Sequence, residues 1–352
     1  MSEFDLNLIT DEAVRIEYTH ILARAERIGQ ALHRAYGAGR LTIKTKYILD
    51  DSFNADADEQ EGRYLISLSA AIPLFNLILF GRLFSDPDIM PELDASGTLA
   101  SDYELPAVID PSNFSKRSNW KIELNPIRAF AAGTLADLCS TFIVCHEMGH
   151  VLSGHVEGMR VYEGQSSVSE FVRQLEIPKI DFDRRQAWEL DADIIASSLL
   201  MEFIGDLWRS TESNPRSKMV FGAGHEGLEN IISTGIVSLF AFFCYLNGTR
   251  DKLELESTHP HPLVRAYYIR DMIVNLARTR WDVDPISIAR LIDKRLDEFL
   301  RVLQKNSLFD AREFTSRRAR AIEKDVARIK ELQVRHRSSC AKWCWISWHG
   351  DK

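Results

Sequence analysis

Hydrophobic residues recur every three or four positions over most of the chain, and this spacing predicts a mainly helical protein. The first such helix is expected between Thr10, as its N-cap, and Gly37, as its stop. A second, strongly hydrophobic helix is expected after Pro73, before a connection rich in Pro, Asp and Ser that runs to residue 119. Further helices are predicted near 126–153, 183–205 and 228–246, from Pro262 onward, and between 286 and 335.

A different pattern, in which hydrophobic and polar residues alternate, occupies two short segments near the N-terminus. Residues 41–50 alternate Ile, Thr and Tyr with lysines, and residues 62–70 form a second strand-like segment. Such alternation is typical of half-buried strands. We therefore expect an N-terminal β-hairpin, with the acidic stretch 51–61 as its solvated loop. Together the patterns predict an α+β fold that is predominantly helical.

The elements suggest three regions along the chain. Residues 1–119 would form a helix, the hairpin and an apolar helix that pack on a catalytic core at 120–280, and residues 281–352 would form a helical, basic extension with a Trp-rich tail. Residues 301–337 hold 11 Lys and Arg against 5 Asp and Glu. Because acidic residues interleave with the basic ones, ion pairs along helix faces explain this stretch. The tail is expected to be a packing segment.

Composition narrows the class of protein. With 45% hydrophobic and 27% charged residues, the chain of 352 residues is globular, and its net charge of −8 predicts no nucleic-acid partner. The five cysteines are odd in number and lie mostly in apolar runs, which favours reduced thiols in the cytosol over disulfides. The N-terminus has neither the basic nor the apolar region of a secretory signal. We therefore expect a cytoplasmic protein.

One segment meets the length criterion for a membrane span. Asn230 to Thr249 holds 20 residues without a charge. Its apolar centre is shorter and carries Ser233, Thr234 and Ser238, and a fully buried core helix explains it equally well. Membrane association is not expected, but it stays open as an alternative.

The strongest chemical signal is the HExxH motif at residues 146–150. Positions i and i+4 lie one turn apart on one helix face, so His146 and His150 can reach a single metal ion. Asn125 and the proline after it supply a helix start, and hydrophobic residues precede the histidines on the same stripe. The alternative is a pair of buried histidines that bind carboxylates or backbone carbonyls. If the two histidines bind a metal ion, Glu147 is expected to be the general base.

A second helix offers the third ligand. A catalytic zinc takes three protein ligands and keeps one position open for water. Glu189 can be the third ligand, and Asp193, one turn further, can accept the second ring N–H of a liganding histidine. Asp191 points to a different face and is not expected to take part. Asp183 and Gln186 would cap this helix.

Three further residues complete the candidate site. His259, in the segment Thr-His-Pro-His-Pro, could donate to the oxyanion of a tetrahedral intermediate, although a histidine at a helix start explains it too. Arg265 would be an ion-pair partner of a carboxylate in the site. His155 stands one residue from where a metzincin needs its third histidine, so a role in local orientation is expected.

In this order, the motifs HExxH, ExxAD and THPxxxxR resemble the gluzincins of the CAAX prenyl protease and HtpX type, which are membrane proteins. The chain is more similar to the Lit peptidase family, which is associated with phage exclusion in bacteria. That family's HExxHxxxxH is matched by His146 to His155, its ExxAD by Glu189 to Asp193, and its THP segment at His259 with Arg265. The resemblance covers residues 40–275 and implies a zincin-like core, zinc bound by His146, His150 and Glu189, and elongation factor Tu as target.

The expected function is that of a zinc-dependent endopeptidase with one zinc ion per chain and a protein or peptide substrate. Two alternatives remain open. The chain could be a non-catalytic regulator or scaffold that uses a zinc-bound core to bind a partner protein, although Glu147 would then have no role. It could also be an HtpX-like protease associated with membranes through Asn230–Thr249. Nothing in the sequence specifies the substrate, the cleaved bond, the activating trigger or the oligomeric state.

Overall fold

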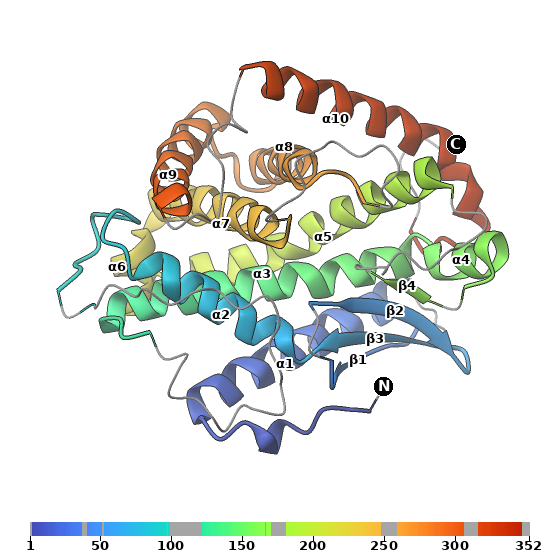
Figure 1. The fold of residues 1–352 in the computed structure, drawn as a ribbon, viewed down its shortest axis with the longest axis horizontal. Coiled ribbons are helices and arrows are strands. Elements are labelled where there is room, and N and C mark those ends of the chain that lie inside the picture. Colours follow the sequence, from blue (N-terminus) through green and yellow to red (C-terminus); the bar gives the residue numbers. More distant parts are fainter. Residues whose placement is uncertain are drawn as a thin grey trace.

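Two long helices, α3 (Pro126–Leu152) and α5 (Phe182–Ser210), pack along each other at the centre of the structure (Figure 1). The computed structural model describes residues 2–36, 41–50, 53–96, 98, 122–165, 167–169, 181–247, 259–305 and 316–346, and all structural statements refer to these. One side of the central pair is covered by helices α1 and α2 and a small sheet, and the other side by α7 to α10.

The helices account for most of the described chain, so the prediction of a predominantly helical α+β fold is confirmed. Besides the central pair, their bounds are α1 Glu12–Tyr36, α2 Ala71–Phe84, α4 His155–Glu163, α6 Pro215–Phe221, α7 Gly224–Asn247, α8 Pro262–Trp281, α9 Pro285–Lys305 and α10 Ser316–His336. Two 3₁₀ helices, η1 (Leu6–Leu8) and η5 (Arg337–Trp343), lie near the ends of the chain.

The predicted hairpin is wrong in its pairing. The acidic stretch that we expected as a loop forms strand β2 (Ala55–Gln60), which pairs antiparallel with β3 (Arg63–Ser69). Strand β1 (Ile43–Ile48) pairs with β3 in parallel, and β4 (Ser167–Ser169) adds to the other side of β2, so the order is β1-β3-β2-β4. The tight turn lies at Glu61 and Gly62, which both have positive φ, as a two-residue hairpin turn requires.

Three helix starts differ from prediction. Asp11, rather than Thr10, accepts from the amide of Val14 at the start of α1. Asp181, rather than Asp183, accepts from the amide of Arg184 at the start of α5. Helix α2 begins at Ala71, so Pro73 lies in its first turn, where the missing N–H costs no hydrogen bond. Asn125 caps α3 as predicted, while Gly37 lies outside the described residues.

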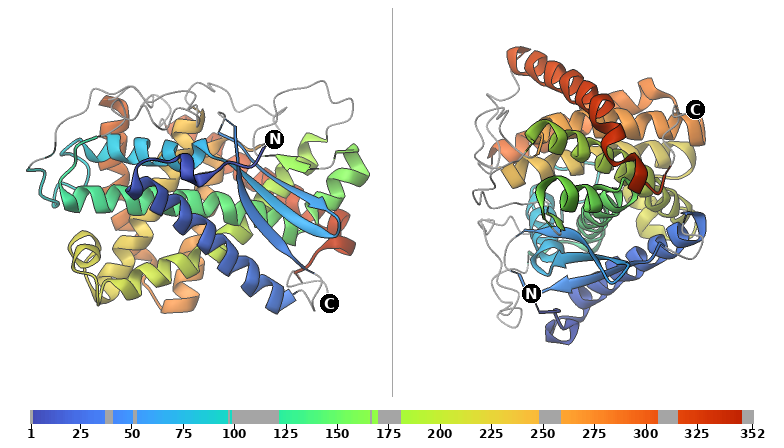
Figure 2. Two further views of the ribbon diagram at one scale, coloured as in Figure 1. Left: turned by 90° about the horizontal axis from the view of Figure 1, so that it is seen from below. Right: turned by 90° about the vertical axis from the view of Figure 1, so that its right-hand side faces the viewer.

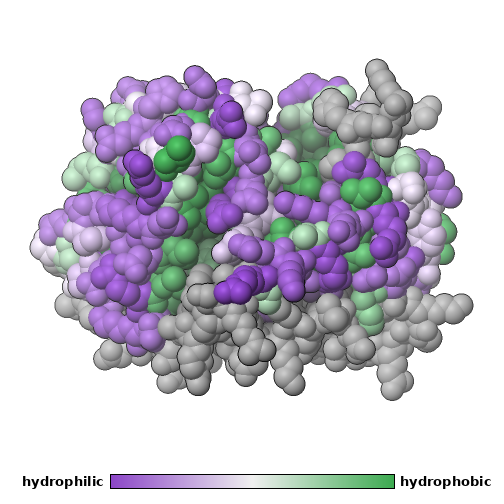
Figure 3. All heavy atoms as spheres, turned by 90° about the horizontal axis from the view of Figure 1, so that it is seen from above, coloured by the Kyte–Doolittle hydropathy of each residue, from purple (hydrophilic) through white to green (hydrophobic). Residues whose placement is uncertain are grey.

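Helices α3 and α7 are both long and apolar enough to cross a membrane by length and composition alone. That test is weak, because buried core helices pass it too. Of the apolar window of α7, 89% is buried inside the protein, and its Ser233, Thr234 and Ser238 are fully buried. The face seen in Figure 3 is mostly hydrophilic, with smaller hydrophobic areas among the polar residues. These observations favour a core helix at α7; Gly248 and Thr249 lie outside the described residues.

The C-terminal helices pack on the central pair rather than away from it. Helix α10 lies along α5 and α8, and η5 then contacts α4 (Figure 2). The amide of Trp345 donates to the carbonyl of Leu152, at the end of α3, over 2.8 Å. A Cβ atom at Gly154 would lie 2.8 Å from the backbone of Trp343, so the tail fits closely against the turn between α3 and α4. The described part of the Trp-rich tail is therefore a packing segment, as expected.

Candidate metal centre

A glycine allows α3 and α5 to approach closely where the HExxH motif faces the ExxAD motif. A Cβ atom at Gly149 would lie 2.7 Å from the carbonyl oxygen of Ala192 and 2.8 Å from its Cα, distances that real Cβ atoms essentially never show. The spacing i, i+4 places His146 and His150 on one face of α3. The close helix contact then sets Glu189 of α5 against both rings.

Three side chains converge at this contact, the two histidines through Nε2 and Glu189 through both carboxylate oxygens. Nε2 of His146 lies 3.1 Å from Nε2 of His150 and 3.2 Å from Oε2 of Glu189, and Nε2 of His150 lies 3.5 Å from Oε1 of Glu189. These three side chains are at most 3% exposed. No other group of three or more His, Cys, Asp or Glu in the described chain has the geometry of a metal site.

The donor set fits a zinc ion. Two atoms that each lie about 2.0–2.1 Å from a tetrahedral ion are separated by about 3.3–3.4 Å, close to the three separations observed. Oε2 of Glu189 is buried and makes no hydrogen bond to the described residues, as expected of a metal-ligand atom. Two imidazoles and one carboxylate also form the ligand set of catalytic rather than structural zinc sites.

His146 is oriented by a carboxylate. Its Nδ1 lies 2.8 Å from Oδ1 of Asp193, which is fully buried. Arg265 donates to both oxygens of Asp193 at 2.9 Å, and Tyr268 donates to Oδ2 at 2.5 Å. Burial by itself would raise the pKa of Asp193, but the charge of Arg265 together with His146 outweighs it and holds the pKa below its usual value. The ionised Asp193 can only accept, so His146 donates from Nδ1 and presents Nε2 to the cluster.

His150 is oriented through a second imidazole. Its Nδ1 lies 3.0 Å from Nδ1 of His155, whose Nε2 lies 3.7 Å from Oδ2 of Asp191. Burial lowers the pKa of His155, although Asp191 opposes this, so the ring is neutral and donates from one nitrogen only. With Nε2–H directed at Asp191, Nδ1 of His155 accepts from His150. His150 is thereby oriented with its Nε2 toward the cluster.

Two neighbouring side chains hold His155 and Asp191 in place. Trp188 stacks on the His155 ring, with centroids 5.0 Å apart and planes 14° apart. Gln333 of α10 donates to Oδ1 of Asp191 over 2.5 Å. Asp191 is not one of the converging ligands, in line with its different helix face, but its side chain meets the histidine that orients His150. The C-terminal helix thus contacts the site.

The two candidate catalytic residues also lie here. Glu147 is fully buried on α3 beside His146. Nε2 of His259 lies 3.5 Å from Oε1 of Glu189; this nitrogen is buried, although the side chain as a whole is 14% exposed. His261 has a different place: its Nδ1 accepts from the amide of Leu263 and caps α8. The threonine of the THP segment, Thr258, lies outside the described residues.

The structure thus brings together seven of the eight residues selected from the sequence and adds others; the eighth, Glu147, is buried next to His146 on α3. Gly149, Trp188, Tyr268 and Gln333 were missed. Gly149 lies inside HExxH and Trp188 directly precedes ExxAD, so their positions were a signal. Tyr268 comes three residues after Arg265, so the two residues are neighbours on the surface of α8. Nothing near Gln333 in the sequence links it to the site.

The two orienting carboxylates predict graded effects on metal affinity. Asp193→Asn is expected to weaken zinc binding by about 10- to 100-fold, because Asp193 contacts a ligand directly. Asp191→Asn should have a smaller effect, because it acts through His155. Competition with a chromogenic chelator measures both, and Asp183→Asn, at a half-exposed position of the same helix, is the control. A larger loss in Asp191→Asn than in Asp193→Asn would contradict the two relays.

Comparison of the chain with protein-family models, with curated proteins and with solved structures finds no match. The assignment of the site therefore depends on its geometry.

Proposed function

We propose that the chain is a zinc-dependent endopeptidase with a zincin-like core, in which His146, His150 and Glu189 hold one zinc ion. The observation that carries this proposal is the convergence of three buried side chains, whose Nε2 and carboxylate oxygen atoms lie 3.1–3.5 Å apart, with the buried Glu147 beside His146 on α3. The contacts of Asp193 with His146 and of His155 with His150 support it, because they orient both rings so that each Nε2 faces the same point. A pair of satisfied core histidines would not need this arrangement.

The electrostatic balance supports a divalent cation. Glu147, Glu189, Asp191 and Asp193 are all buried, as are His146 and His150. Arg265 brings one positive charge to this group through Asp193. Buried carboxylates are costly unless they are paired or bind a metal. A zinc ion would bring the local charge close to balance.

The residues present support peptide hydrolysis as the reaction. Zinc, when bound, would polarise the scissile carbonyl and lower the pKa of a water molecule toward neutrality. Glu147 would take a proton from the attacking water and deliver it to the leaving amine as the C–N bond breaks. His259, at the more exposed side of the cluster, would donate to the oxygen that becomes negative in the tetrahedral intermediate.

His259 and His261 form an internal comparison. His259→Ala is expected to lower kcat by about 10²- to 10³-fold with little change in KM, because the donor is needed mainly by the transition state. His261→Ala removes only a helix cap and should cost about 1 kcal/mol of stability with kcat nearly unchanged. Steady-state kinetics and thermal unfolding of both variants measure this. Wild-type kcat in His259→Ala would make His259 a structural residue.

The proposal for the substrate is a cytosolic protein, and the resemblance to Lit peptidases makes elongation factor Tu the first target to test. Its experiment is N-terminal proteomics of a bacterial lysate treated with the wild-type chain or with Glu147→Gln. New N-termini that need intact Glu147 would support a peptidase and identify the bond. Equal N-terminal profiles with a full zinc content in both would favour the regulator or scaffold instead.

We further propose a cytoplasmic location, supported by the burial of α7 in the protein core. The chain is expected to remain in the supernatant after cell disruption without detergent and ultracentrifugation. Retention in the membrane pellet after a carbonate wash would contradict this and favour the HtpX-like alternative, with α7 or α3 as the spanning segment.

A further inference from the structure

The two carboxylates that orient the metal-site histidines are held in different ways. Asp193 accepts hydrogen bonds from Arg265 and Tyr268, which both belong to α8. Among the described residues, Asp191 forms no ion pair with a lysine or an arginine, and Gln333 of α10 donates to its Oδ1 over 2.5 Å. A neutral amide of the C-terminal helix therefore holds this second carboxylate, where an arginine and a tyrosine hold the first.

Gln333 lies on the buried face of α10. Ile322, Ile329 and Gln333 follow each other at spacings of seven and four residues, which places them on one face of the helix. All three side chains are at most 6% exposed. A glutamine in such a position is removed from water, so its amide needs a partner inside the protein. That partner is Asp191, which is also buried, and the hydrogen bond between them is shielded from water.

The contact continues from Asp191 to a metal ligand. Oδ2 of Asp191 lies 3.7 Å from Nε2 of His155, and Nδ1 of His155 lies 3.0 Å from Nδ1 of His150. Because Gln333 binds Oδ1, rotation of the Asp191 carboxyl group is restricted and Oδ2 stays directed at His155. Trp188 restricts the His155 ring from its flat face. A side chain of the C-terminal helix thus influences the direction in which His150 points.

The segment that carries Gln333 is fixed to the core on both sides of it. Before Gln333, Arg328 donates to Oε1 of Gln186 of α5 over 2.5 Å. After it, Tyr162 of α4 donates to the carbonyl of Ser339 in η5 over 3.0 Å. The position of Gln333 therefore depends on the docking of α10 and η5 on α5 and α4 (Figure 2).

We propose that Gln333 is a positioning residue of the metal centre, through which the docking of α10 controls zinc affinity. Gln333 holds Asp191, Asp191 and Trp188 hold His155, and His155 keeps Nε2 of His150 directed at the ion. The inference rests on the proposed zinc site and deepens it, because it couples zinc binding to the C-terminal helix. Such coupling is reciprocal, so bound zinc also stabilises α10 against local opening.

The first test compares the zinc affinity of Gln333→Met with that of the wild type by competition with a chromogenic chelator. Methionine has a similar length and suits a buried position, but it cannot donate to Asp191. Loss of a group that contacts a ligand directly typically weakens metal binding by about 10- to 100-fold, and Gln333 acts two contacts further away. We therefore expect a loss of about three- to tenfold.

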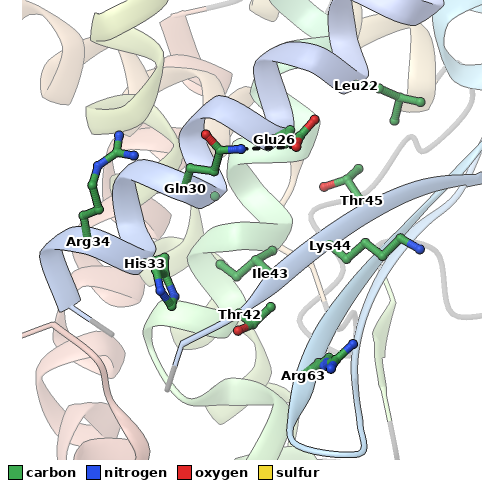
Figure 4. Close-up of a pocket in the computed structure, with 11 residues that line it drawn as sticks. Leu22, Glu26, Gln30, His33, Arg34, Thr42, Ile43, Lys44, Thr45 and Arg63 are labelled. Atoms are coloured by element: carbon green, nitrogen blue, oxygen red, sulfur yellow. Dashed lines mark hydrogen bonds between the residues drawn. The ribbon is translucent and has the colours of Figure 1, made fainter. Parts of the chain in front are cut away.

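A matched control is available on α1. Gln30 is exposed and donates to Glu26 over 3.2 Å, so Gln30→Met also removes a hydrogen bond from a glutamine amide to a carboxylate. Both residues line a cavity of about 650 Å³ between α1 and β1, and none of the described residues in that lining belongs to the metal centre (Figure 4). Gln30→Met should therefore bind zinc with wild-type affinity.

A double-mutant cycle shows whether Gln333 acts through Asp191. Asp191→Leu removes both carboxylate oxygens and leaves a side chain of similar shape. In this background Gln333→Met should change zinc affinity by less than about twofold, because the contact between the two residues is already lost. If the two losses add instead, Gln333 affects the site only through helix packing, and the positioning role is contradicted.

Hydrogen exchange measures the reciprocal effect. Zinc should slow the exchange of backbone amides in α10 by about three- to tenfold more than in α9, which carries no residue of the metal centre. In Gln333→Met this extra protection of α10 should disappear. An equal effect of zinc on α9 and α10 in the wild type would mean that zinc stabilises the chain as a whole, and would overturn the coupling.

The outcomes separate the positioning role from the metal centre itself. A wild-type chain that binds no zinc would overturn the metal centre and the positioning role with it. A wild-type chain that binds zinc, together with unchanged affinity in folded Gln333→Met, would overturn the positioning role alone. If Gln333→Met does not fold, Gln333→Asn takes its place: its amide is one methylene group shorter, and the same loss of affinity is expected.

Discussion

Glu147→Gln is expected to lower peptide hydrolysis by about 10²- to 10⁴-fold while the chain keeps its fold and its zinc. The amide has nearly the shape of the carboxyl group but cannot take the proton of the attacking water. Glu147 is not one of the three converging ligand residues, so the metal site is expected to stay intact. Turnover of a cleaved peptide, followed with zinc content and melting temperature, measures the effect.

The outcome separates catalysis from structure. Glu147 is fully buried, so the melting temperature decides whether lost activity comes from the reaction or from unfolding. A Glu147→Gln chain with wild-type turnover would contradict the role of general base. A chain that unfolds would call for Glu147→Asp, which keeps the carboxyl group but shortens its reach and should retain part of the activity.

Removal of a ligand is expected to abolish stable zinc binding. Four-ligand zinc sites bind with about 10–16 kcal/mol, or roughly 3–4 kcal/mol per ligand, so one lost ligand weakens binding by roughly 10²- to 10³-fold. His146→Ala, His150→Ala and Glu189→Ala should therefore fall from one zinc per chain to nearly none after dialysis against a weak chelator. Elemental analysis of the dialysed protein gives the ratio.

A histidine outside the cluster supplies the matched control. His261 lies two residues from His259 but caps α8, so His261→Ala should keep its zinc. A full complement of zinc in both His146→Ala and His150→Ala would contradict the metal site. The cluster would then be a set of buried histidines and carboxylates that bind each other.

Much of the candidate site could be predicted because it depends on local geometry. The i, i+4 spacing of His146 and His150, and of Glu189 and Asp193, places each pair on one face of a helix wherever that helix lies. Asn125 and the proline after it set the start of α3 in the same local way. Such features follow from residues that are near each other in sequence.

The sheet could not be predicted from its pattern. Alternation of hydrophobic and polar residues identified two strands, but their partners are chosen by hydrogen bonds between segments. The acidic stretch 51–61 is predicted to be a loop because Asp56, Asp58 and Glu59 favour full solvation. It forms a strand because Ala55 and Ala57 alternate with them and are fully buried against the core.

What the sequence by itself determined is therefore the helices and the two motifs that supply the ligands, since both depend on a repeat of about one helical turn. The tertiary structure decided how the ligands are held. The approach of α3 to α5 depends on the absence of a side chain at Gly149, and the relay from His150 to His155 and Asp191 ends at Gln333, 142 residues from Asp191 along the chain. Contacts over such a separation arise from the packing of whole helices, because no local spacing rule relates the residues that meet.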